Sequence, residues 1–177
     1  MDAEKASAVV QRLRVQRLTT MSLADQITAD RWREPVLPGN VPLHDVLSHL
    51  LAWDEWAVGV FEISLIRDLP QVFQHGIDDV DAFNARAQNR YRGISRDDML
   101  SALQSANPRL IASAESRGIA EWYNRQIDGL RFSTNEEEHH APTVGEILRV
   151  LRKHESEHDR EIMATFNIAP KLDQDQD

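Results

Sequence analysis

Apolar residues recur at helical spacing in four long segments of this chain, and no segment shows the regular alternation of a half-buried strand. The segments run over about 3–27, 42–69, 95–117 and 143–167, and a shorter helix is expected over 80–92. The sequence therefore predicts an all-α chain with four principal helices, a pattern that suits a four-helix bundle.

Helix-starting and helix-breaking residues locate the ends of these segments. Pro42 is well placed in the first turn of the second helix, where its missing N–H is not needed. Ser95 suits the N-cap of the third helix, and Thr143 with Glu146 forms a T-x-x-E capping box before the fourth. Pro108 lies inside the third segment and predicts either a kink or two abutting helices.

The remaining stretches are expected to be irregular. Prolines and a glycine interrupt the helical pattern at 32–40, and the long region 118–142 contains a polar run. The final stretch, 170–177, is acidic, has few apolar residues and is expected to be disordered. We therefore predict one domain over 1–169, followed by this acidic tail.

The composition excludes several classes of function. A chain of 177 residues can bury one real core without the help of a metal or a disulfide. Its formal charge of −9 argues against a nucleic-acid partner. It has no cysteine, which leaves histidine, aspartate and glutamate as metal ligands. With neither a signal-peptide pattern nor an apolar run of roughly 20 residues, we expect a cytoplasmic protein without a membrane partner.

Two histidines four residues apart, His154 and His158, lie on the apolar side of the fourth predicted helix. That side is a stripe at helical spacing, formed by Ile147, Leu151, His154, His158, Ile162 and Phe166. Side chains four residues apart project from one face of a helix, so both imidazoles can reach one point. This geometry suits a metal ion; the alternative is a pair of hydrogen-bonded or partly exposed helix histidines.

His49 is the third candidate ligand, because it too is embedded in a strongly apolar helical run. The nearby His44 belongs to the first turn and is expected to face solvent or to cap the helix. Three neutral imidazoles plus water form an open site of the kind that catalytic metals retain. Imidazole suits zinc, nickel and iron, and copper as well, so the ion's identity stays open. The alternative for His49 is a hydrogen-bonded histidine in the core.

Charged residues surround the histidine pair. We expect Glu155, Glu157 and Asp159 to face mainly solvent, with the alternative that one of them orients an imidazole. The 17 arginines are interleaved with acids along the chain, so they are expected to form solvated faces and ion pairs.

Aromatic residues form a second set of candidates. Trp53, Trp56 and Phe61 are expected in the core, with stacking against a substrate as the alternative. Trp122 and Tyr123 lie in the long irregular region and are better placed to line the mouth of a pocket.

Three polar residues complete the candidates. His139 and His140 follow an acidic run and are expected in a solvated loop, with a lid that carries a ligand or a proton shuttle as the alternative. Asn84 could hydrogen-bond a ligand, and a capping or helix-interior role is the alternative.

Several of these motifs together resemble one family. The pattern D-V-L-x-H-L-x-x-W-D within 42–56, and the segment T-V-G-E-I that leads into H-x-x-x-H, resemble the DinB/YfiT-like metalloenzyme superfamily. The segments 80–84 and 95–100 are similar to its ClbS/DfsB-type and maleylpyruvate-isomerase-like branches. The likeness spans about 30–166.

This resemblance implies an up-down-down-up four-helix bundle with a metal held by His49, His154 and His158. Relatives include thiol-dependent transferases and isomerases that use bacillithiol, mycothiol or glutathione, and a ClbS-type hydrolase that opens a reactive cyclopropane toxin. We therefore predict a hydrolase or thiol S-transferase whose ion activates water or a low-molecular-weight thiol against an electrophilic small molecule. We also expect a homodimer, because exposed apolar helix faces of bundles often pair. The alternatives are a metal-independent small-molecule binding or toxin-resistance protein, and a homodimer that serves in interaction alone.

Overall fold

The computed structural model describes residues 2–37, 39–116, 123–135 and 138–171. Most of these residues are helical, which confirms the mostly helical chain that the sequence predicts. Of the predicted acidic tail, only Pro170 and Lys171 are described, and the Lys171 N–H donates to Ser22 Oγ at 2.7 Å. No helix in these four ranges is long and apolar enough to cross a membrane.

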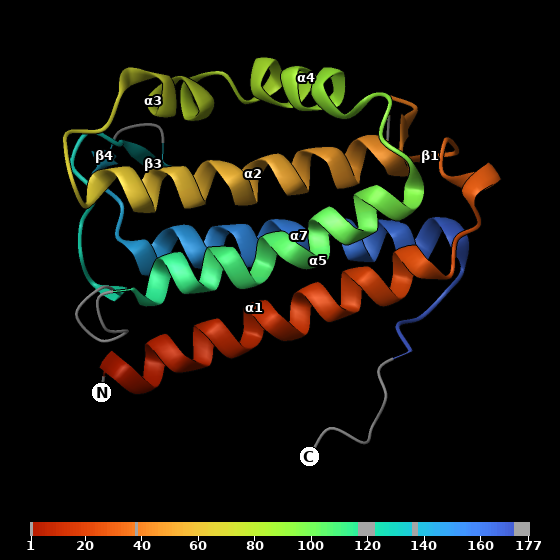
Figure 1. The fold of residues 1–177 in the computed structure, drawn as a ribbon, viewed down its shortest axis with the longest axis horizontal. Helices are drawn as coiled ribbons and strands as arrows, with labels where there is room; N and C mark the ends of the chain where they lie inside the picture. The colour runs from red at the N-terminus through yellow and green to blue at the C-terminus, as the bar shows by residue number, and fades with distance from the viewer. Residues whose placement is uncertain (1, 38, 117–122, 136–137, 172–177) are drawn as a thin grey trace.

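The four principal helices are α1 (Asp2–Asp25), α2 (Leu43–Ser64), α5 (Arg96–Glu115) and α7 (Val144–Phe166). Figure 1 shows them side by side, with α1 and α7 running one way across the view and α2 and α5 the other. Helices α1 and α2 each pack against both α5 and α7.

Among the described residues, shorter helices are η1 (Ala29–Arg31), α3 (Gln71–Asp78) and α4 (Val80–Tyr91). Helix α4 matches the predicted short helix, whereas α3 was not predicted. Helix α4 packs against the side of α2 (Figure 1). Helix α2 ends at Ser64, five residues earlier than predicted.

Two small antiparallel hairpins replace parts of the stretches predicted to be irregular. They pair β1 (Pro35–Leu37) with β2 (Val41–Pro42), and β3 (Phe132–Asn135) with β4 (Glu138–His140). Strands of two to four residues are too short for alternation to be visible in the sequence. Pro42 therefore ends a strand and occupies the N-cap of α2, rather than its first turn.

The predicted helix caps are confirmed. The Asp98 N–H donates to Ser95 Oγ at 3.1 Å at the start of α5. At the start of α7 the Glu146 N–H donates to Thr143 Oγ1 at 3.2 Å, and the Thr143 N–H donates to Glu146 Oε2 at 2.6 Å. These reciprocal bonds form the capping box and fix the point from which α7 presents its histidines.

The prediction of two abutting helices at Pro108 is wrong, because α5 continues through it as one element. Leu103 before the proline and Leu110 after it are both fully buried. Packing on both sides offsets the backbone hydrogen bond that proline cannot make.

The core consists of two apolar clusters, one toward each end of the long helices. Each cluster draws on all four helices, for example through Leu23, Leu47, Met99 and Ile162 in one, and Leu13, Phe61, Leu110 and Ile147 in the other. Along α1, α2 and α7 the residues between these clusters include buried polar side chains. The candidate site lies at this middle level.

Candidate metal centre

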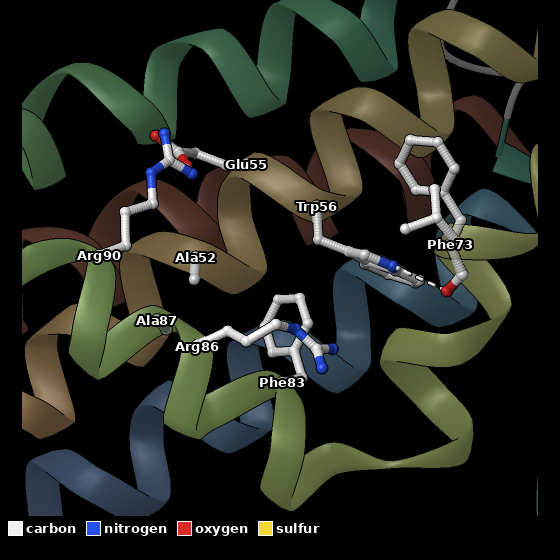
Figure 2. Close-up of a pocket in the computed structure, with 9 residues that line it drawn as sticks. Ala52, Glu55, Trp56, Phe73, Phe83, Arg86, Ala87 and Arg90 are labelled. Atoms are coloured by element: carbon white, nitrogen blue, oxygen red, sulfur yellow. Dashed lines mark hydrogen bonds and ion pairs between the residues drawn. The ribbon is translucent and has the colours of Figure 1, made fainter.

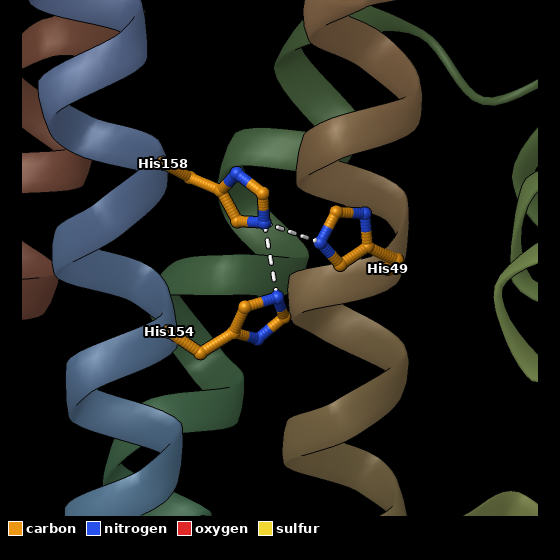
Figure 3. Close-up of side chains that lie close together, drawn as sticks. All are labelled: His49, His154 and His158. Carbon is orange, nitrogen blue, oxygen red and sulfur yellow. Dashed lines mark hydrogen bonds between the residues drawn. The ribbon is translucent and has the colours of Figure 1, made fainter. Parts of the chain in front are cut away.

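Three imidazoles converge between α2 and α7. His158 Nε2 lies 2.9 Å from His49 Nε2 and 3.0 Å from His154 Nε2 (Figure 3). One nitrogen from each ring lies within 4.8 Å of the other two, so the three histidines could hold a divalent ion. The prediction that His49 meets the H-x-x-x-H pair is confirmed.

The outer nitrogens of two rings fix which inner nitrogens carry protons. His49 Nδ1 lies 3.2 Å from the carbonyl oxygen of Asp45, and His158 Nδ1 lies 2.7 Å from Glu161 Oε2. A carbonyl and an ionised carboxylate only accept hydrogen bonds, so both Nδ1 atoms donate. In a neutral ring, a proton on Nδ1 leaves a lone pair on Nε2. When both rings are neutral, His49 and His158 therefore direct lone pairs toward each other.

Two lone pairs at hydrogen-bond distance need an electropositive partner. His154 can donate from Nε2 to His158, but this proton leaves the contact between His49 and His158 without a donor. A cation between the three nitrogens resolves the conflict, because each Nε2 then donates its lone pair. The donor set therefore fits a divalent ion of the kind that imidazole ligates.

The protonation state of the rings also favours metal binding. Burial lowers the pKa of His49 to about 3, and the charges of His158 and His154 contribute to the shift. Burial, followed by the charge of His158, lowers the pKa of His154 to about 4. Both rings are consequently neutral near pH 7, the form that binds metals. His49 is buried and the other two rings are half-buried, so the centre lies near the edge of the helical core.

Glu161 is a residue of this site that the sequence interpretation missed. Its carboxylate orients His158 from the outer side, a role that the sequence analysis assigned to Glu155, Glu157 or Asp159 as an alternative. The available signal is the spacing of three residues between His158 and Glu161, which places both on one helix face.

The expectation that Glu155 and Asp159 face solvent is wrong, and only Glu157 of the three acids is exposed. Glu155 and Asp159 are 3% and 2% exposed. Arg17, 4% exposed, donates from Nε to Glu155 Oε1 at 2.7 Å and from Nη2 to Asp54 Oδ2 at 2.8 Å. This arginine therefore belongs to a buried ion cluster rather than to a solvated face.

Two carboxyls of the ion cluster bind their protons more tightly than usual. Thr20 Oγ1 lies 2.7 Å from Glu155 Oε1 and 3.0 Å from Asp159 Oδ2, but a hydroxyl has one proton and can donate to only one of them. Burial, followed by the charge of Glu155, raises the pKa of Asp159 to about 7. Burial also raises the pKa of Asp54 to about 6. Asp159 is thus the carboxyl that supplies the second hydrogen bond.

Other candidate histidines lie outside the metal centre. His44 is 2% exposed, so the expectation of a solvent-facing residue is wrong; its Nδ1 lies 3.0 Å from Asp45 Oδ1. His140 belongs to β4 rather than to a loop, and its Nε2 lies 3.3 Å from Glu146 Oε1. The side chain of His139 lies outside the described residues.

The aromatic candidates divide between core and edge. Phe61 and Trp56 are buried as predicted, and Trp53 is half-buried. Asn84 Oδ1 accepts from Trp53 Nε1 at 3.2 Å, so its side chain serves a contact within the protein. Tyr123 lies against Gly145, and its hydroxyl accepts from Arg149 Nη1 at 3.1 Å. Trp122, which was predicted with Tyr123 to line the mouth of a pocket, lies outside the described residues.

Comparisons with protein-family models, with curated proteins and with solved structures found no match for this chain.

Proposed function

We propose that this protein is a metal-dependent enzyme of the DinB/YfiT type, with His49, His154 and His158 as ligands of a zinc, nickel or iron ion. One observation carries the proposal: three imidazole Nε2 atoms face one another, and two of them are committed as lone-pair donors by their Nδ1 hydrogen bonds. Such an arrangement favours a bound cation over a purely structural contact.

The proposal includes an up-down-down-up four-helix bundle as the scaffold. The contacts of α1 and α2 with both α5 and α7 support it. The composition of the two core clusters also supports it, because the end of α1 shares a cluster with the beginnings of α2 and α5 and the end of α7.

The chemistry follows from what the chain provides at this centre. A divalent ion supplies a lowered pKa to a coordinated water or thiol, which yields a nucleophile at neutral pH. Asp45 and Glu161 keep the ligand rings oriented, and three protein ligands leave room for a further ligand. We infer a hydrolase or thiol S-transferase that acts on an electrophilic small molecule, with a low-molecular-weight thiol as co-substrate in the second case.

Metal content tests the first part of the proposal. Protein purified without a histidine tag is expected to contain about one divalent ion per chain by elemental analysis, and His158→Ala is expected to lose it. His75→Ala is the matched control, because His75 is exposed on α3 and outside the cluster. Cobalt added to the metal-free wild type should produce the visible absorption of a tetrahedral site. Wild type that binds neither zinc nor cobalt would rule the site out.

Turnover tests the second part. Metal-loaded protein is incubated with an epoxide or an activated aryl halide, in water or with glutathione, and product is followed by mass spectrometry. We expect His154→Ala to lower the rate by at least about 100-fold, since loss of a ligand should exceed the 10- to 100-fold effect of residues that orient ligands. A metal-binding protein whose rate equals that of His154→Ala would contradict the enzymatic proposal while leaving the metal site intact.

A further inference from the structure

A pocket of about 300 Å³ lies where α3 and α4 pack over α2 (Figure 2). Its apolar lining includes Ala52, Trp56, Phe73, Phe83 and Ala87. The volume is at the lower end of the range of about 300–1,000 Å³ for small-molecule sites. Helix α2 presents His49 to α7, whereas its Ala52 and Trp56 line the pocket together with residues of α3 and α4, and none of the three histidines lines it.

The aromatic walls offer ring faces rather than hydrogen bonds. Trp56 Nε1 already donates to the carbonyl oxygen of Phe73 at 3.1 Å, a bond that also fastens α3 to α2. Gly76 permits this approach, because a Cβ there would lie 3.2 Å from Trp56 Nε1 and 3.3 Å from Phe83 Cδ2. The walls therefore match a flat apolar body and leave polar recognition to the charged residues of the lining.

Those charged residues are two arginines and one glutamate. Glu55 Oε2 accepts from Arg90 Nη1 at 2.6 Å and from the Tyr91 hydroxyl at 2.7 Å, so its charge is compensated within the protein. The guanidinium of Arg86 has no hydrogen bond or ion pair with any residue in the described part of the chain. The pocket consequently has one uncompensated positive charge, although the whole chain carries −9.

We propose that this pocket binds a small aromatic carboxylate, with its ring among Trp56, Phe73 and Phe83 and its carboxylate on Arg86. The planar guanidinium matches a carboxylate through two parallel hydrogen bonds. One uncompensated positive charge corresponds to a single negative charge on the ligand, which favours a carboxylate over a doubly charged phosphate ester. The limited volume restricts the ligand to one or two rings.

This inference goes beyond the proposed metal chemistry and does not depend on it. The pocket is lined by none of the three histidines. Trp53 nevertheless links the two places: its ring centroid lies 4.2 Å from that of Phe83, and it follows His49 by one helical turn. An occupant of the pocket would therefore contact an aromatic cluster that extends toward the histidines.

Calorimetric titration with 2-naphthoate and its neutral amide, 2-naphthamide, tests the proposal on the full chain. Naphthoate is expected to bind at least about fivefold more tightly, because only the carboxylate forms charge-assisted hydrogen bonds with Arg86. Arg86→Gln should weaken naphthoate about tenfold and leave the amide unchanged. Arg92→Gln is the matched control, since this nearby arginine donates to Asn89 and does not line the pocket.

Each alternative result overturns the proposal. Absence of naphthoate binding at millimolar concentration excludes the site, and equal affinity for the amide excludes the carboxylate. Equal losses of naphthoate affinity in Arg86→Gln and Arg92→Gln would show that the net charge of the surface, rather than a contact with Arg86, attracts the ligand. A chelator that removes bound metal is expected to leave naphthoate affinity unchanged, so the metal proposal can fail without affecting this one. Shifted indole N–H resonances of Trp53 and Trp56 would locate the ligand.

Discussion

Helix α7 carries two polar groups at nearly the same level, one buried and one half-buried, and they differ in their hydrogen-bond partners. On one side, Glu155 and Asp159 meet Arg17 and Thr20 of α1, so that acids face a cation and a hydroxyl. On the other side, His154 and His158 meet His49, so that bases face a base. The first group is a structural ion cluster, whereas the second is a set of three bases whose inner nitrogens face one another.

Burial alone therefore does not distinguish a functional site from a structural one. Both groups contain titratable residues whose pKa values burial has shifted. In the ion cluster the shift is accommodated by a retained proton and a guanidinium. In the histidine cluster, hydrogen bonds on the outer nitrogens direct the inner lone pairs to a common point, which is the preorganisation that a metal ligand set requires.

Removal of Arg17 should produce the largest effect, because it disrupts the buried ion cluster. Arg17→Met leaves Asp54 and Glu155 buried without their counter-charge, which is expected to lower the free energy of unfolding by about 3–5 kcal/mol. Arg14→Met, an exposed position on the same helix, should change it by less than about 0.5 kcal/mol. Denaturant titration measures both, and equal stabilities would show that the cluster is dispensable.

Addition of a metal ion should stabilise the folded protein through the three histidines. A ligand present at 100 times its dissociation constant stabilises the folded state by about 2.7 kcal/mol, so zinc is expected to raise the melting temperature of the wild type. His158→Ala should show no such rise, whereas His75→Ala should respond as the wild type does. A rise of equal size in all three proteins would assign zinc binding to another part of the chain.

The pH dependence of stability distinguishes the two groups by sign. The pKa of Asp159 is raised from 3.8 to about 7, so the folded state binds its proton more tightly and this contribution to stability is lost as the pH rises from about 4 to 7. Asp159→Asn should remove that loss, gaining up to about 4 kcal/mol relative to wild type between pH 4 and pH 8.

The lowered pKa values of His49 and His154 act in the opposite direction, since their contribution is lost as the pH falls below about 6.5. The difference between wild type and Asp159→Asn isolates the carboxyl from these rings. Glu157→Gln, an exposed position on the same helix, is the control. Parallel stability curves for wild type and Asp159→Asn would mean that Asp159 keeps its ordinary pKa.

The smallest expected effect concerns Glu161, which orients His158 without contacting the other two rings. Glu161→Ala should weaken zinc affinity about tenfold, the lower end of the range for such residues, because its side chain is partly exposed. Competition with a chromophoric chelator measures this change, and Glu62→Ala, at an exposed position on α2, should leave the affinity unaltered. An unchanged affinity in Glu161→Ala would show that packing alone orients His158.

The sequence by itself determined the features that depend on local spacing. Helical periodicity predicted the four long helices, the T-x-x-E box predicted the start of α7, and the spacing of four placed His154 and His158 on one face. These features follow from backbone geometry and from hydrogen bonds between residues close in the chain, so they are present in the order of residues alone. The partnership with His49 also required the apolar setting of that residue and the family resemblance.

Tertiary structure alone decided which charged residues are buried. Glu155 and Asp159 have the same sequence character as the exposed Glu157, and no local pattern separates them. Their burial depends on Arg17, which precedes Glu155 by 138 residues and reaches it only because α1 packs against α7. A helix enclosed by neighbours on two sides buries more of its circumference than one apolar stripe indicates, and the desolvated acids there require counter-charges from distant segments.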